Sequence, residues 1–127
     1  MQDRKRILVV DDDENVRFVL ARALARLGSE YDIVLAGDGG DALRLIDELA
    51  VDLLISDIRL PGLDGIALTR ALRQRGQRLP VIWITAYGGP AIADKMAELD
   101  VCRCIDKPVE VAEIRRAALQ ALRVEPA

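Results

Sequence analysis

Four runs of apolar residues in this chain end abruptly in polar side chains, and this pattern limits the possible folds more than any other feature. The polar endings are Asp11 with Asp12, Asp57, Thr85 and Lys107. Buried parallel strands are nearly continuous apolar runs, because helices cover both faces of such a sheet. The carboxyl ends of parallel strands share one edge, where open α/β folds bind their ligands. We therefore expect the four endings to converge on one site.

Segments with helical periodicity separate these runs and predict five βα units. The strands are expected to begin near five positions, namely Ile7, Tyr31, Leu53, Val81 and Val101. Gly28 and Gly76 are placed to end two helices, and Pro90 is placed to begin another. Strands that alternate with helices pair in parallel through right-handed crossovers. The sequence predicts a doubly wound α/β domain with strand order 2-1-3-4-5 and helices on both faces.

Length, charge and hydropathy limit the class of protein. A chain of 127 residues fits one domain, which we expect to cover residues 1–127 with a short C-terminal tail at 123–127. The formal net charge of -3 gives no electrostatic reason to expect nucleic acid as a direct partner. No apolar stretch approaches the roughly 20 residues of a membrane span, and the N-terminus lacks the apolar region of a signal peptide. We expect a cytoplasmic protein with no membrane partner.

The chain has no histidine and two cysteines, and both facts exclude kinds of site. Without histidine there is no His-based triad, imidazole metal site or phosphohistidine on this chain, so a carboxylate must carry any phosphate chemistry. Cys102 and Cys104 are awkwardly spaced for a disulfide if they lie on one strand, and two cysteines cannot build a structural zinc site. We expect reduced thiols, with Cys104 as a small core residue.

The carboxylates expected at this sheet edge need a cation beside them. Asp13 is expected to cap the following helix, since a carboxylate is favourable at a helix N-terminus. Asp11 and Asp12 would then face Asp57, and the like charges would repel one another unless a cation neutralised them. Lys107 supplies one positive charge, and oxygen ligands suit Mg²⁺ better than a soft metal. The sequence therefore predicts a Mg²⁺ site suited to phosphoryl chemistry.

Loop residues beside two strand ends add to this prediction. After the third strand, Pro61 and Gly62 are expected to form a tight turn, and Gly65 is expected to let the chain enter a helix. Lys107 precedes Pro108, and a proline drives the residue before it into an extended or turn conformation. A lysine in that conformation can reach over the edge of the sheet.

Four segments together make the chain resemble the receiver domain of a bacterial two-component response regulator. They are ILVVDDD at 7–13, LISDIRLPGLDG at 54–65, IWITAYG at 82–88 and DKP at 106–108. Each motif is weak alone, but all four in this order and spacing are specific, and the resemblance covers essentially the whole sequence. It implies a phosphorylation-dependent switch in a phosphorelay rather than a conventional enzyme.

The resemblance also implies a phosphoacceptor and a set of metal ligands. Asp57 resembles the residue that attacks a phosphohistidine on a partner histidine kinase or phosphotransfer protein, forming an aspartyl phosphate. Asp12 would hold Mg²⁺ directly and Asp11 would hold it through water. Asp57 and the backbone carbonyl of Arg59 would complete the protein ligands.

Two further residues would connect the phosphoryl group to a partner surface. Lys107 would pair with one phosphoryl oxygen, and Thr85 would donate a hydrogen bond to another. These contacts would pull the fourth and fifth strand ends toward Asp57, so the fourth helix, fifth strand and fifth helix would form the bistable surface. The implied partners are a downstream effector protein, a following output domain, or a second copy bound through that surface.

The chain departs from the family pattern near its fifth strand. Cys104 stands where the family commonly has a tyrosine or phenylalanine that changes exposure together with the threonine. Asp100 and Val101 replace a usual Gly-Ala pair. We hypothesise that signalling is weaker or differently routed as a result. Arg59 and Tyr87 flank the predicted site, where their side chains could screen the phosphoryl group from water, which predicts slow dephosphorylation.

Three alternatives compete with this interpretation. The first is a receiver-like module that binds partners without phosphorylation, and Cys104 is its support. The second is a phosphatase of the haloacid-dehalogenase type with Asp11 as nucleophile, but Asn15 departs from that motif and no acidic pair follows Lys107. The third is a flavodoxin-like electron carrier, whose phosphate loop would be rich in hydroxyls and glycine, whereas the loop here is acidic.

Overall fold

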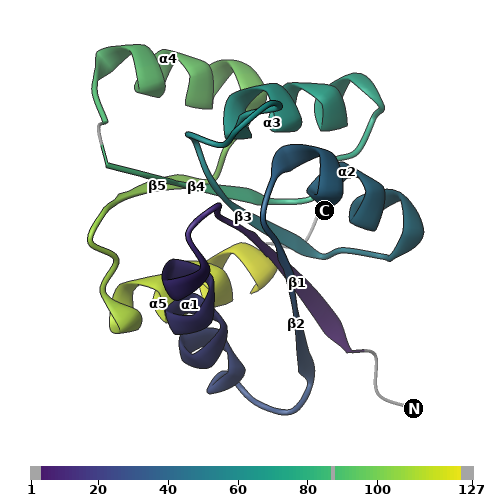
Figure 1. Ribbon diagram of the computed structural model, residues 1–127, viewed down its shortest axis with the longest axis vertical. Helices are drawn as coiled ribbons and strands as arrows, with labels where there is room; N and C mark the ends of the chain where they lie inside the picture. The colour runs from purple at the N-terminus through teal and green to yellow at the C-terminus, as the bar shows by residue number, and fades with distance from the viewer. Residues whose placement is uncertain (1–3, 87, 124–127) are drawn as a thin grey trace.

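Five parallel strands form the sheet in the computed structural model, which describes residues 4–86 and 88–123 (Figure 1). Their order is β2-β1-β3-β4-β5. The strands are β1 (Lys5–Val10), β2 (Tyr31–Ala36), β3 (Leu53–Asp57), β4 (Val81–Thr85) and β5 (Arg103–Asp106). The predicted fold class and strand order are confirmed.

Helices cover both faces of this sheet, as Figure 1 shows. They are α1 (Glu14–Ala25), α2 (Gly39–Glu48), α3 (Gly65–Gln74), α4 (Pro90–Leu99) and α5 (Val111–Arg123). The helices α1 and α5 lie side by side on one face, and α2, α3 and α4 lie on the other. Among the described residues, no helix has the length and apolar character needed to cross a bilayer.

Alternate residues of β1 divide between the two layers of the core. Ile7 and Val9 pack with α1 and α5, whereas Leu8 and Val10 pack with α2, α3 and α4. The central strands β3 and β4 are buried along their whole length, as expected for parallel strands covered on both faces. Burial of one such aliphatic side chain stabilises a fold by roughly 1.5–3 kcal/mol. This packing holds the strand ends firmly in place.

The helix ends follow the residues that the sequence indicated. Asp13, Asp38 and Asp64 cap α1, α2 and α3, each accepting hydrogen bonds from backbone N–H groups of the first turn. The predicted cap at Asp13 is therefore confirmed. Gly76 follows α3 with a φ of 79°, a left-handed conformation that favours glycine, and Pro90 begins α4.

The start of β5 differs from the prediction, which placed it near Val101. The strand begins at Arg103 because the preceding residues close α4 instead. Asp100 caps α4 in the left-handed conformation, with a φ of 57°, and the Val101 N–H donates to the Met96 carbonyl at 2.9 Å. A backbone N–H used in this way is not available to the ladder.

Three other boundaries also differ from the predictions. The first strand begins at Lys5, somewhat earlier than predicted, and α1 ends at Ala25, before the turn that contains Gly28. Arg123, predicted to open the tail, is the last residue of α5. Residues 124–127 lie outside the described residues. Shifts of this size are usual at helix and strand ends.

The two cysteines are free, but they do not share a strand face as the prediction assumed. Cys102 is exposed and precedes β5, with its N–H donating to the Val81 carbonyl at 2.9 Å. Cys104 lies within β5 and is half-buried rather than fully enclosed. It packs at the edge of the core under α4.

Candidate functional site at the carboxyl edge of the sheet

Three carboxylates meet where β1 and β3 end. Asp11, Asp12 and Asp57 each offer an oxygen, and these oxygens all lie within 4.8 Å of one another. The register of the two neighbouring strands aligns Val10 with Ser56, which brings the following residues together. Asp11 is 0% exposed and Asp57 is 5% exposed, whereas Asp12 faces solvent. A half-open acidic pocket of this kind suits a hard divalent cation.

Lys107 reaches into this cluster from the end of β5. Its Nζ lies 2.6 Å from Asp57 Oδ2 and 3.1 Å from Asp11 Oδ2. Its backbone N–H donates to the Thr85 carbonyl at 2.8 Å, which joins it to the end of β4. Burial lowers the pKa of Lys107, but its contacts with the two carboxylates outweigh burial and leave the pKa raised. The lysine is therefore a firmly charged counter-ion.

Asp11 is the most enclosed member of the cluster. Its Oδ1 accepts a hydrogen bond from the Asp13 N–H at 2.9 Å. Burial raises the pKa of Asp11, and the nearby Asp57 charge acts in the same direction, while the Asp13 N–H and Lys107 only partly oppose them. Among the described residues, Asp11 Oδ2 is buried with no hydrogen bond of acceptable geometry, although the Lys107 ammonium is close. A bound cation would satisfy this oxygen.

The backbone of the loop after β3 contacts Asp57 and fixes its position. Asp57 Oδ1 accepts a hydrogen bond from the Arg59 N–H at 3.0 Å. The Gly65 N–H donates to the Ile58 carbonyl at 2.9 Å, which returns the chain to the strand end, and Gly62 makes the predicted turn with a φ of 72°. A Cβ on Gly65 would lie 2.2 Å from the Asp57 carbonyl oxygen. The helix α3 begins at Gly65, as predicted, and the close approach of the backbone is what requires glycine at this position.

The predicted site residues are therefore brought to one edge of the sheet. Thr85 ends β4 and is 2% exposed, and its strand lies between those of Asp57 and Lys107. Arg59 is exposed beside the cluster. Tyr87, which we predicted to flank the site, lies outside the described residues. The chemical roles of these residues remain predictions.

One buried chain of hydrogen bonds behind the site was not predicted. Trp83 Nε1 donates to Thr69 Oγ1 at 2.9 Å, and the Thr69 hydroxyl donates to the Gly65 carbonyl at 2.8 Å. Gly65 itself lies against the Asp57 carbonyl. The contact joins α3 to β4, and an isolated threonine in a helical segment gives no signal that would reveal it.

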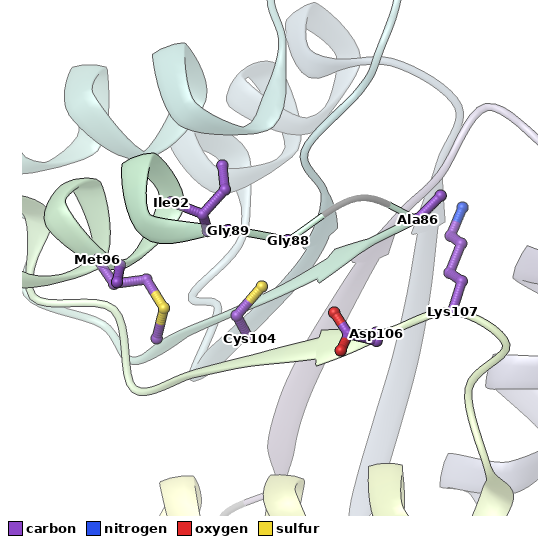
Figure 2. A pocket seen from close by; sticks show the side chains of 9 residues that line it. Ala86, Gly88, Gly89, Ile92, Met96, Cys104, Asp106 and Lys107 are labelled. Atoms are coloured by element: carbon purple, nitrogen blue, oxygen red, sulfur yellow. The ribbon is translucent and has the colours of Figure 1, made fainter.

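A hollow of about 610 Å³ opens between α4 and β5, next to the acidic cluster (Figure 2). Ile92 and Met96 of α4 border it on one side, and Cys104 and Asp106 of β5 border it on the other. Lys107 lies at the end that adjoins Ala86, as Figure 2 shows. The small Cys104 thiol leaves this space open, whereas an aromatic ring would occupy part of it.

Comparison with known proteins decides the family. The family model for the response regulator receiver domain matches residues 7–119. This chain belongs to the response regulator receiver family. Receiver domains are the signalling switches of two-component systems, and phosphorylation-dependent switching is their general role. Family members typically bind Mg²⁺ in an acidic pocket.

The relatives place receivers in different kinds of protein. The chain is 37% identical over 123 residues to the sensor histidine kinase RcsC of Salmonella typhi, covering 96% of this chain and 13% of RcsC. It is 36% identical over 107 residues to the DNA-binding transcriptional regulator NtrC of Escherichia coli K12, covering 84% of this chain and 22% of NtrC. The chain thus spans less than a quarter of either relative.

Solved receiver structures share the fold. The signal receiver domain of NarL from Mycobacterium tuberculosis superposes with a TM-score of 0.86 at 30% identity, covering 97% of this chain and 99% of that domain. The chemotaxis protein CheY4 of Vibrio cholerae also has a TM-score of 0.86, at 23% identity, covering 94% of this chain and 99% of that one. Family membership argues against the phosphatase and electron-carrier alternatives.

Proposed function

We propose that this receiver accepts a phosphoryl group on Asp57 from a phosphohistidine of a partner kinase or phosphotransfer protein, and changes its partner binding as a result. The observation that carries the proposal is the arrangement around Asp57. This nearly buried carboxylate lies within 4.8 Å of the Asp11 and Asp12 oxygens and 2.6 Å from Lys107 Nζ. Such an arrangement serves to neutralise charge on a transferring phosphoryl group.

The donor set fits Mg²⁺, which would neutralise charge on the phosphoryl oxygens when bound. The candidate ligands are the carboxylates of Asp11, Asp12 and Asp57, with the backbone carbonyl of Arg59. All are oxygens, as a hard cation prefers. The buried Asp11 Oδ2 supports the assignment, because among the described residues it makes no hydrogen bond of acceptable geometry, although the Lys107 ammonium lies 3.1 Å away.

The chain's own residues account for the transfer step. An Asp57 carboxylate oxygen forms the new bond to phosphorus while the bond from phosphorus to the partner's imidazole nitrogen breaks, and the electron pair stays on that nitrogen. Hydrogen bonding from the Arg59 N–H fixes the carboxylate in one orientation. The Lys107 ammonium, which pairs with Asp57 before transfer, can then follow a phosphoryl oxygen, and the Thr85 hydroxyl can donate to another.

The switch would act through the ends of β4 and β5. The Lys107 N–H already donates to the Thr85 carbonyl at 2.8 Å, so movement of either residue is transmitted to the other strand. Movement of Thr85 toward Asp57 would change the hollow under α4. The partner classes that fit are an effector protein, an output domain of a longer chain, and a second copy bound through α4, β5 and α5.

The proposal is tested by intact-protein mass spectrometry after incubation with acetyl phosphate and Mg²⁺. We expect one phosphoryl adduct on the wild-type chain, and we expect it to be lost in Asp57→Asn or when a chelator is present. Asp47→Asn, an exposed carboxylate on α2, serves as the matched control and should keep the adduct. An adduct that survives in Asp57→Asn would overturn the assignment. No adduct on the wild-type chain would favour a receiver that works without phosphorylation.

The Cys104→Tyr exchange is expected to strengthen the response of α4 to phosphorylation. A tyrosine ring would enter the hollow under α4 and contact both that helix and Thr85. We expect phosphorylation to change the opening equilibrium of α4 by about fivefold more than in wild type, which is the low end of usual coupling factors. Hydrogen exchange of the α4 amides with and without acetyl phosphate measures this coupling. Cys102→Tyr, at an exposed position two residues earlier, is the control. An unchanged difference in exchange in Cys104→Tyr would contradict the prediction.

Replacing Arg59 with alanine is expected to shorten the lifetime of the phosphorylated form. The exposed Arg59 side chain lies beside the cluster and would screen the phosphoryl group from water. Exposed charges contribute little interaction free energy, so we expect the lifetime of the phosphorylated form to fall by about threefold. The measurement is loss of the phosphoryl adduct with time after removal of acetyl phosphate. Arg44→Ala on α2 is the control. Equal lifetimes in Arg59→Ala and wild type would show that this side chain does not screen the phosphoryl group from water. The same measurement on Tyr87→Ala tests the second predicted screening residue.

A further inference from the structure

Arg17 links the first helix to the loop that carries the acidic pair. It lies near the start of α1 and is partly buried. Its Nη1 donates to the Asp11 carbonyl oxygen at 2.7 Å, a short charge-assisted hydrogen bond. The guanidinium group also lies over Gly37, after the end of β2, where a Cβ would come to 3.2 Å from Nη1. A glycine at position 37 therefore leaves room for the arginine.

This hydrogen bond completes the fixing of Asp11. The Asp11 N–H donates to the Ala36 carbonyl at 3.2 Å, and Asp11 Oδ1 accepts from the Asp13 N–H at 2.9 Å. The carbonyl held by Arg17 belongs to the peptide unit that joins Asp11 to Asp12. Because a peptide unit is planar, holding its carbonyl sets the plane from which the Asp12 side chain departs. The Arg17 hydrogen bond thus holds the backbone from which the exposed Asp12 carboxylate projects.

The charge of Arg17 is used differently from that of Lys107. The Lys107 ammonium contacts carboxylate oxygens of Asp11 and Asp57 directly, where it occupies space beside the candidate metal ligands. Arg17 instead contacts a backbone carbonyl. It therefore orders the loop without using a carboxylate oxygen.

We infer that Arg17 is a positioning residue for the metal, which orients Asp12 and so raises the affinity of the acidic cluster for a divalent cation. The inference rests on the proposed function, because it assigns Asp12 to the cation. It concerns affinity rather than the transfer step, since Arg17 contacts neither Asp57 nor Lys107 in any hydrogen bond found among the described residues.

Calorimetric titration of the metal-free chain with Mg²⁺ tests this inference. Arg17→Met keeps the length of the side chain but removes its donors, and we expect the Kd for Mg²⁺ to rise about tenfold. Arg17→Lys should recover part of the loss. Arg22→Met removes the same charge further along α1, where the guanidinium stacks on Phe18, and should leave the Kd unchanged.

Phosphorylation rates separate positioning from chemistry. With acetyl phosphate, the Mg²⁺ concentration at half-maximal rate should rise in Arg17→Met in parallel with the Kd. The rate at saturating Mg²⁺ should stay within roughly twofold of wild type, since the transfer residues are untouched. A lower saturated rate with an unchanged half-maximal concentration would overturn the inference.

A second variant keeps the arginine in place and guards against a folding defect in Arg17→Met. The Gly37→Ala methyl group should displace the Arg17 guanidinium. We therefore expect faster hydrogen exchange of the Asp13 amide in metal-free protein. We also expect weaker Mg²⁺ binding, as in Arg17→Met. Wild-type affinity in both Arg17→Met and Gly37→Ala would overturn this inference alone. A wild-type chain that binds no Mg²⁺ would overturn the proposed function as well.

Discussion

Replacing Lys107 with alanine is expected to slow phosphoryl transfer to Asp57 by roughly 100-fold, the usual loss when one fixed charge stabiliser is removed. Lys107 Nζ lies 2.6 Å from the Asp57 carboxylate, where it can remain paired with the phosphoryl group as charge develops. The rate of adduct formation with acetyl phosphate at saturating Mg²⁺ measures the effect. Lys95→Ala on α4, a half-exposed lysine 3.5 Å from Glu98, is the control.

The same substitution should destabilise the metal-free protein at neutral pH. It leaves Asp11 and Asp57 nearly buried and facing each other without this counter-ion, at a cost of about 3 kcal/mol. The pKa of Asp11 is already raised above its ordinary value by burial, so its contribution to stability is favourable in acid and is lost as pH rises through the folded-state pKa. Removing the lysine raises that pKa further.

The destabilisation should therefore be larger at pH 7 than at pH 4. Urea unfolding of wild type and Lys107→Ala in the presence of a chelator gives the two free energies of unfolding. Because the pKa of Lys107 is raised above 10.5, the lysine stays charged across this whole range. If the loss of unfolding free energy in Lys107→Ala did not depend on pH, the ion pair would not be the source of that loss. Added Mg²⁺ should restore part of the stability by replacing the missing charge.

Gly65→Ala should lower the stability of the fold and disturb Asp57 together. The new Cβ would lie 2.2 Å from the Asp57 carbonyl oxygen and 3.0 Å from the Ile58 Cα, and both are backbone atoms that side-chain rotation cannot move. We expect a cost of about 3 kcal/mol, at the upper end of ordinary overpacking, and a Tm lower by roughly 10 °C. Thermal unfolding followed by circular dichroism measures this.

A matched variant separates the effect of the clash from the general effect of replacing a helical glycine with alanine. Gly40→Ala also places alanine in the first turn of a helix, but its nearest neighbour would be Asp38 Oδ1 at 3.5 Å, an ordinary contact. Its Tm should change little. If Gly65→Ala and Gly40→Ala melt alike, the close approach of α3 to the Asp57 carbonyl does not limit stability. In Gly65→Ala we also expect slower adduct formation, because the strand end itself must move.

Much of the fold could be predicted because its signals are local. The apolar runs ending at Asp57 and Thr85 are continuous enough to indicate buried parallel strands, and the aspartate before α1 indicates a cap. The convergence of the polar endings followed from strand direction alone. The start of β5 could not be predicted, since it depends on the left-handed conformation of Asp100, which few residues other than glycine adopt and which no pattern near Asp100 indicates.

Other parts of the site depend on contacts between distant segments. The requirement for Gly65 comes from the distance between α3 and β3, which sequence spacing does not reveal. The bond from Arg17 to the Asp11 carbonyl and the bond from Trp83 to Thr69 were missed for the same reason. A side chain that bonds to a backbone carbonyl or a buried hydroxyl gives no periodic signal. These contacts appear only when packing is known.

The buried chain of hydrogen bonds behind the site has a practical consequence. Trp83 is the only tryptophan of the chain, it is fully enclosed, and its indole N–H is two hydrogen bonds away from the backbone that touches Asp57. Tryptophan emission from the unlabelled protein therefore comes from one ring in one environment behind the strand end. The native chain thus contains its own fluorophore, through which unfolding can be followed in real time without an attached dye, and we expect cation binding at the strand end to change its emission.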